Sequence, residues 1–156
     1  MVAKNKADRS GKQKASARTV KPERPVVMRQ FVVYGRPQPQ GSTRSFVKGN
    51  RVVTTSANKN LKPWRQQVSE TLMYEVGSFT GDGKETVALA MSFYFQKPKS
   101  ANRKHMTVKP DLDKLVRGIL DSGTGVLYKD DSQVNVMSAT KDYGSPERVE
   151  ISMVRQ

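Results

Sequence analysis

The sequence has no cysteine, one histidine and no long hydrophobic run. The absence of cysteine excludes a disulfide framework, thiolate metal ligands and a cysteine nucleophile. No apolar stretch approaches the ~18 residues that span a bilayer, and no hydrophobic segment follows the basic N-terminal residues as in a secretory signal. The lack of cysteine also fits a reducing interior, so we expect a cytoplasmic protein.

Acidic residues are scarce as well, because 14 Asp and Glu stand against 28 Lys and Arg, for a formal charge of +14. Residues 1–24 hold eight basic and two acidic side chains, so the rest of the chain still carries +8. Such a surplus favours polyanionic partners through phosphate contacts and counterion release. The charge therefore predicts a nucleic-acid partner, with a basic tail on an otherwise ordinary protein as the alternative.

The chain divides into two parts by composition. Residues 1–25 have no aromatic and almost no large apolar side chains, so burial cannot offset their ordering entropy, and a basic disordered tail is predicted. The tail could lie loosely on DNA or serve only as a solubilising segment. Residues 26–156 have the length of a single domain.

Hydrophobic patterning predicts an α/β fold of the α+β kind, with a single mixed β-sheet and two main helices packed on it. Runs of β-branched and aromatic residues predict main strands at 30–34, 86–95, 133–141 and 148–154. The largely apolar strand 86–95 is expected to be central in the sheet. Apolar residues at three- and four-residue steps predict helices over 58–77 and 112–121, and the first places Trp64 in the core.

A hairpin is predicted around Gly49-Asn50, a pair that suits a tight turn with positive φ. Its cationic tip could contact DNA phosphates, or it could be an ordinary solvated turn. A second basic segment, 97–104, lies shortly before the main acidic cluster. The DNA-contacting candidates in these regions are Arg36, Arg44, Lys48, Arg51, Lys97, Lys99, Arg103 and Lys104.

The few acidic residues are clustered. Asp111 and Asp113 lie two positions apart at the predicted start of the second helix, and Asp130-Asp131 lies in the turn after it. Pro110 allows the helix to begin just after itself, so an extended Asp111 and a first-turn Asp113 can converge. Carboxylates are the oxygen ligands of Mg²⁺, which offsets charge on a phosphodiester and activates water. An acidic cluster in a basic chain therefore predicts a metal site that acts on nucleic acid.

The same residues also have structural explanations. Aspartate is a common helix cap and complements the helix dipole. Asp113 and Arg117 could form an i,i+4 ion pair, and Asp130-Asp131 could simply begin a turn. His105 could be a base or a DNA contact, although a solvent-exposed loop residue is the favoured explanation. The residue pattern alone leaves these readings open.

Three segments together resemble the signature of the RusA-type Holliday junction resolvases. They are Pro110–Leu115 (PDLDKL), Ile119–Asp121 (ILD) and Gly125–Val134 (GVLYKDDSQV). The family signature is an Asp-Leu-Asp-Asn-Leu helix start, an Asp within the helix and an Asp-Asp-x-Gln-Val turn. The order of the other predicted elements agrees with the family.

The resemblance implies a homodimeric endodeoxyribonuclease that cuts four-way DNA junctions with Mg²⁺ or Mn²⁺ in recombination and repair. It implies that Asp111, Asp113 and Asp131 are catalytic metal ligands, and that Asp121 and Asp130 are acidic positions of less defined role. Many members are encoded by phages or prophages, which implies the cytoplasm of a bacterium or of a phage-infected cell.

Two positions depart from the family. Arg117 stands where the family has a functional lysine; arginine keeps the charge but cannot release a proton, so an electrostatic rather than a general-acid role is expected. Lys114 replaces the usual asparagine and is a further candidate for a phosphate contact. A non-catalytic DNA-binding or architectural protein, or an RNA-binding protein, would explain the charge but not the acidic cluster.

Overall fold

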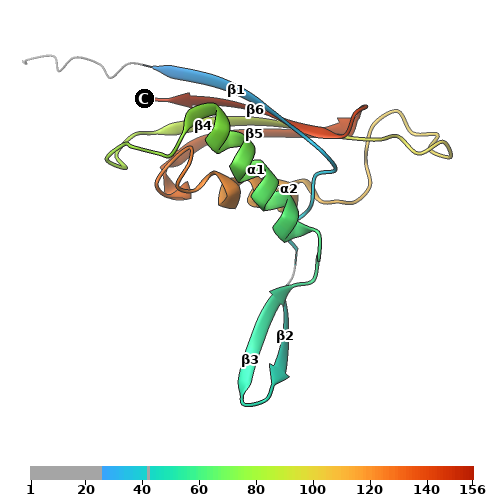
Figure 1. Ribbon diagram of the computed structural model, residues 1–156. Coiled ribbons are helices and arrows are strands. Elements are labelled where there is room, and N and C mark those ends of the chain that lie inside the picture. Colours follow the sequence, from blue (N-terminus) through green and yellow to red (C-terminus); the bar gives the residue numbers. More distant parts are fainter. Residues whose placement is uncertain (1–25, 42) are drawn as a thin grey trace, which may run out of the picture.

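The computed structural model describes residues 26–41 and 43–156; the predicted basic tail, residues 1–25, lies outside the described residues. Figure 1 shows a sheet, two helices and a projecting hairpin. The elements in chain order are β1 (Val27–Tyr34), β2 (Thr43–Lys48), β3 (Arg51–Ser56), α1 (Leu61–Val76), β4 (Val87–Phe95), α2 (Leu112–Gly123), the 3₁₀ turn η1 (Asp131–Gln133), β5 (Val134–Tyr143) and β6 (Arg148–Arg155). The α/β prediction is confirmed, and each predicted helix and strand is present with bounds that differ by a few residues.

Four strands form one mixed sheet in the order β1-β6-β4-β5. β4 pairs antiparallel with β6 and parallel with β5, so the strand predicted as central is central. A parallel pair needs a long crossover connection, because the chain must return to the starting end of the sheet. Here the crossover holds the basic loop 97–104, α2 and η1, and it therefore carries the whole acidic motif.

The core lies between the sheet and the helices, which pack against it and against each other. Alternate strand residues face this core, as the period of two in their burial requires. The helices supply an apolar stripe made of Leu61, Trp64, Val68, Leu72, Leu115, Val116 and Ile119. Trp64 is 4% exposed, which confirms the core prediction for it. None of the described helices is long and apolar enough to cross a membrane.

The hairpin stands apart from the main sheet. β2 and β3 form their own two-stranded antiparallel ribbon, which projects from the body of the molecule (Figure 1). The turn is the predicted Gly49-Asn50 pair between the facing residues Lys48 and Arg51. Gly49 has φ +61°, a conformation that glycine adopts at no steric cost, whereas Asn50 does not have a positive φ. The single-sheet prediction thus holds for the four main strands only.

Candidate functional site

The first two aspartates of the motif lie at the N-terminal end of α2. Asp111 is the N-cap residue with extended backbone angles (φ −70°, ψ 140°), and Asp113 is in the first helical turn. The Asp111 carboxylate makes no capping hydrogen bond; it accepts one from Lys114 Nζ at 2.6 Å. The side chain of Asp111 therefore does not act as the helix cap that its position would allow.

The carboxyl of Asp111 lies among cations. The hydrogen bond from Lys114 and its positive charge are the main causes that hold the pKa of Asp111 below its ordinary value. Lys109 and Lys141 lower this pKa further through their charges. In return, Asp111 raises the pKa of Lys114 above the usual value for lysine. Asp111 is therefore ionised at neutral pH, as a carboxylate metal ligand must be.

Lys141 on β5 holds the segment that leads into α2. Its Nζ donates to the carbonyl oxygens of Val108 at 2.8 Å and Pro110 at 2.7 Å. Sequence reasoning missed this contact, because Lys141 lies thirty positions beyond Asp111 and the crossover topology alone brings the two segments together. Lys141 thus positions the residue that precedes the first aspartate.

Asp130 and Asp131 have different surroundings although they are adjacent. Asp130 Oδ1 accepts from the Ser132 amide at 2.9 Å, and the Gln133 side chain accepts from the Asp130 amide at 3.2 Å. This reciprocal capping box holds η1, and the bonds to Ser132 lower the pKa of Asp130. The turn-starting explanation therefore applies to Asp130, and Asp131 beside it stays exposed at the first position of η1.

Tyr128 anchors the loop that carries Asp131. Its side chain is fully buried, and its hydroxyl donates to the Leu120 carbonyl of α2 at 2.7 Å. Burial, followed by the negative charges of Asp131 and Asp121, raises the pKa of Tyr128 above its ordinary value. A Cβ at Gly123 would lie 2.7 Å from this hydroxyl, so the close fit requires glycine there. The loop before η1 is thereby fixed against α2.

Asp121, the acid within the helix, is engaged in structure. Its carboxylate pairs with Arg65 Nη1 at 3.2 Å and accepts from Gln40 Nε2 at 2.7 Å. Arg65 belongs to α1 and Gln40 to the segment between β1 and β2. Asp121 therefore ties three parts of the fold together.

Most of the predicted DNA-contacting side chains lie either at the hairpin tip or in the loop after β4. Lys48 and Arg51 are exposed at the hairpin tip, and the loop after β4 exposes Lys97, Lys99, Arg103 and Lys104. Arg44 lies in β2, and its side chain is outside what the structure describes. Arg117 is exposed on α2, and in the described part of the chain no ion pair joins it to Asp113.

Two of the predicted cations, Arg36 and Lys97, lie near aromatic rings. Arg36 pairs with Glu147 at 3.3 Å, and its guanidinium lies 6.0 Å from the centroid of the Phe95 ring. Lys97 Nζ lies 5.7 Å from the centroid of the Tyr143 ring. Both cations are thus placed near the end of the sheet from which the crossover leaves.

His105 is exposed but has a partner. Its Nδ1 lies 2.9 Å from the Asp142 carboxylate, which also accepts from the Met106 amide at 3.2 Å. The bond to His105 is the main cause that lowers the pKa of Asp142. These contacts fasten the basic loop to β5 and orient the His105 ring; they leave both predicted roles of His105, loop residue or base, open.

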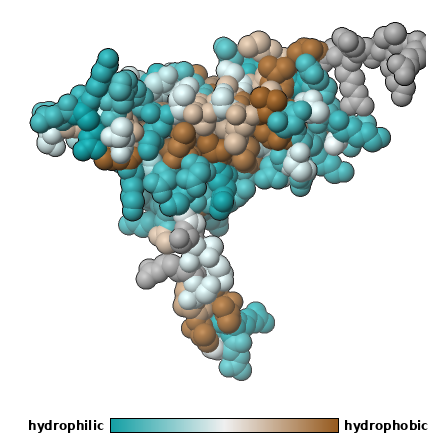
Figure 2. Space-filling view, turned by 180° about the vertical axis from the view of Figure 1, so that it is seen from behind, coloured by the Kyte–Doolittle hydropathy of each residue, from teal (hydrophilic) through white to brown (hydrophobic). Residues whose placement is uncertain are grey.

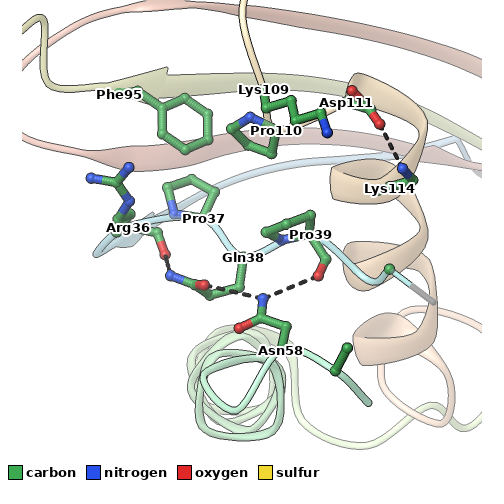
Figure 3. A pocket seen from close by; sticks show the side chains of 12 residues that line it. Arg36, Pro37, Gln38, Pro39, Asn58, Phe95, Lys109, Pro110, Asp111 and Lys114 are labelled. Atoms are coloured by element: carbon green, nitrogen blue, oxygen red, sulfur yellow. Dashed lines mark hydrogen bonds and ion pairs between the residues drawn. The ribbon is translucent and has the colours of Figure 1, made fainter. Parts of the chain in front are cut away.

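A cavity of about 540 Å³ opens beside Asp111. Figure 3 shows phenylalanine and proline rings around it, with cationic side chains at its edge. The lining residues are Arg36, Pro37, Gln38, Pro39, Gly41, Ala57, Asn58, Phe95, Lys109, Pro110, Asp111 and Lys114. Asn58 Nδ2 donates to Gln38 Oε1 and to the Pro39 carbonyl, each at 3.2 Å, and so braces one wall. The volume is that of ordinary ligand sites.

A comparison with known protein families identifies the family to which the chain belongs. The sequence model described as "Endodeoxyribonuclease RusA" matches residues 35–154. The chain belongs to the RusA endodeoxyribonuclease family. The uncharacterized protein YqaN of Bacillus subtilis (strain 168) is 30% identical over 138 residues, which cover 81% of this chain and 94% of YqaN. The resemblance of residues 110–134 thus extends to almost all of the predicted domain.

The RusA-family carboxylates of this chain offer oxygen donors only, which is the chemistry that Mg²⁺ prefers. α2 and η1 are in contact, so the two halves of the motif are adjacent. As the side chains stand, no group of three or more acidic or histidine residues within 26–41 and 43–156 is arranged to hold a metal ion. The donor chemistry fits the metal, and Asp111 would offer it Oδ1, because Lys114 Nζ donates to Oδ2.

Proposed function

We propose that this protein is a Mg²⁺-dependent endonuclease that resolves four-way DNA junctions in recombination and repair. The observation that carries the proposal is the ionised Asp111, which leaves its helix uncapped, within a motif of the RusA endodeoxyribonuclease family. A non-catalytic DNA-binding protein would use the exposed cations. It would give Asp111, Asp113 and Asp131 no role.

In this proposal Asp111, Asp113 and Asp131 hold the metal. Mg²⁺, or Mn²⁺ in its place, supplies charge neutralisation at the phosphate and an activated water when it is bound. The protein adds its own positive charge. Arg117 lies one turn beyond Asp113 on α2, is exposed, and stabilises charge that develops on a phosphate oxygen. Lys114 offers a second cation next to Asp111.

The cavity beside Asp111 gives the DNA strand a place to lie. Arg36, Lys109 and Lys114 surround it with positive charge, while proline and phenylalanine rings form its apolar wall. Phosphate contacts of this kind fix the register of a strand without reading its sequence. The strand that passes the cavity would therefore present a phosphate to Asp111.

Symmetric cutting of two strands needs two sites, so we propose a homodimer. The sheet face that points away from the core supports this, because apolar side chains are exposed on both of its edge strands. Val136 on the edge strand β5 is 59% exposed, and Val32 on the opposite edge strand β1 is 42% exposed. A second copy that covered this face would bury both.

The substrate proposal is tested with a labelled, immobile four-way junction beside a linear duplex of the same sequence. We expect paired nicks at symmetry-related positions of the junction in Mg²⁺, no nicks in EDTA, and little cleavage of the duplex. Tight junction binding without cleavage in Mg²⁺ or Mn²⁺ would leave a structure-specific DNA-binding protein. Equal cleavage of the linear duplex would leave a general nuclease.

A further inference from the structure

The projecting hairpin carries apolar side chains that no other described residue covers. Phe46 is 49% exposed, and Val47 and Val52 are each 72% exposed. Figure 2 shows a hydrophobic patch on the arm, with a hydrophilic tip beyond it. A two-stranded ribbon is marginally stable by itself, and an exposed apolar edge invites association. The patch therefore needs a partner.

The register of the hairpin defines what each face presents. Phe46 pairs with Val53. Two residues nearer the tip, Lys48 pairs with Arg51 on the same side of the ribbon. Val47 faces Val52 on the other side. Each face thus has an apolar pair, and one face adds two cations at the tip.

The charge of the hairpin selects the partner. The segment 43–56 contains three cations, Arg44, Lys48 and Arg51, and no acidic residue. The same hairpin of a second copy would bring like charges together, whereas the phosphates of DNA complement them. The arrangement of apolar side chains flanked by cations is the one that proteins use to enter the stack of a bent or opened duplex.

The base of the hairpin meets the candidate site. Gly41, just before β2, and Ala57, just after β3, both line the cavity beside Asp111. A DNA branch held by the hairpin would therefore be held at a set position relative to the strand that enters the cavity.

We propose that the β2–β3 hairpin is a wedge for branched DNA. In this proposal, which rests on the proposed function for its substrate, the Phe46 ring stacks on a base on one side of the branch point. Val47 and Val52, on the other face of the ribbon, contact the bases on the opposite side. Lys48 and Arg51 hold the flanking phosphates. Bases at a branch point are the easiest to unstack, so the wedge selects junctions over linear duplex. Stacking on an aromatic ring tolerates any base, so the wedge adds no sequence requirement.

The test uses the full-length protein in EDTA, so that no strand is cut, and a four-way junction with 2-aminopurine at the branch point. We expect a rise in 2-aminopurine fluorescence when the protein binds, because the reporter base leaves its stack. Phe46→Ala should lose this rise and weaken junction binding by roughly 5- to 150-fold, the range for one base–aromatic stack. Its affinity for linear duplex should stay at the level of the unaltered protein.

Two further variants make the result specific. Val47→Thr keeps a β-branched side chain and reduces its apolar character, so it should lower the fluorescence rise without unfolding the ribbon. Tyr74→Ala removes an aromatic ring that is 90% exposed on α1, and it should leave both fluorescence and affinity unchanged. Equal fluorescence for the unaltered protein, Phe46→Ala and Val47→Thr would overturn the wedge. Conversion of a dimer to a monomer by Phe46→Ala in light scattering would also overturn it, with a second copy as the partner.

Failure of the wedge and failure of the proposed function are distinguishable. The same junction, transferred to Mg²⁺, reports cleavage independently of base opening. Cleavage with no fluorescence difference between the unaltered protein and Phe46→Ala removes the wedge alone. A fluorescence rise that Phe46→Ala abolishes, without cleavage, removes the nuclease proposal and leaves the wedge.

Discussion

Removal of the Tyr128 hydroxyl alone should disturb the loop that carries Asp131. Tyr128→Phe removes one buried hydrogen bond, the 2.7 Å contact to the Leu120 carbonyl, and leaves the ring in place. Thr124 Oγ1 still donates to that carbonyl at 3.4 Å and offsets part of the loss. We therefore expect a loss of about 1.5 kcal/mol in the free energy of unfolding.

Thermal unfolding measures this loss directly. For a chain of this length, ~1.5 kcal/mol corresponds to a Tm that is about 3–6 °C lower. The matched control is Tyr74→Phe, because Tyr74 is 90% exposed and its hydroxyl can bond to water in both states. Equal Tm values for Tyr128→Phe, Tyr74→Phe and the unaltered protein would refute the reasoning, since they would show that the buried hydroxyl contributes nothing.

The pH dependence of the same pair gives a second check. Folding raises the pKa of Tyr128, mainly through burial. The hydroxyl therefore contributes its full stabilisation only at a pH where Tyr128 is also protonated in the unfolded chain. That condition ends as the pH rises above about 10. The difference in unfolding free energy between the unaltered protein and Tyr128→Phe should therefore shrink from pH 8 to pH 11. A difference that grows with pH would contradict the assigned direction of the pKa.

Three further predictions concern the site. Asp130→Ala should lower the free energy of unfolding in urea by about 1 kcal/mol and reduce the cleavage rate, because η1 loses its cap and no longer holds Asp131. Unchanged stability would contradict the capping role. Lys141→Met should reduce the cleavage rate more than the affinity for DNA, because its two carbonyl contacts position the entry to α2; a loss of affinity alone would show a plain phosphate contact. Lys114→Met should raise the pKa of Asp111 toward its ordinary value in an NMR titration. Folding lowers the pKa of Asp111, so the ion pair stabilises the protein fully above the pKa that Asp111 has in the unfolded chain. This stabilisation is lost as the pH falls through the pKa of Asp111 in the folded protein. An unchanged pKa of Asp111 in Lys114→Met would contradict the pairing.

The elements that the sequence predicted well are those set by local periodicity. The stripe that includes Trp64 and the largely apolar run 86–95 report burial directly, and both lie where expected. The Gly49-Asn50 turn was equally readable, because its geometry depends on neighbouring residues. Nothing local, however, indicated that this hairpin would leave the main sheet.

The chemistry of the site was readable only in part. The spacing of Asp111 and Asp113 placed them correctly around the helix start. It could not separate Asp130, which caps η1, from its exposed neighbour Asp131, because both have the same side chain in the same turn. The contact of Lys141 and the cavity beside Asp111 depend on segments that are distant in sequence, so composition and spacing carried no sign of them.

The most direct test of the central claim is the single-turnover cleavage of a four-way junction in Mg²⁺ by Asp111→Asn, Asp113→Asn and Asp131→Asn. The control is Glu70→Gln, which removes an exposed carboxylate of α1 that bonds Gln66 at 2.8 Å. We predict that each aspartate variant is at least about 100-fold slower, since several kcal/mol of charge stabilisation are lost, while Glu70→Gln keeps the rate. Cleavage by Asp111→Asn at the rate of the unaltered protein would contradict the claim that these carboxylates form the nuclease site.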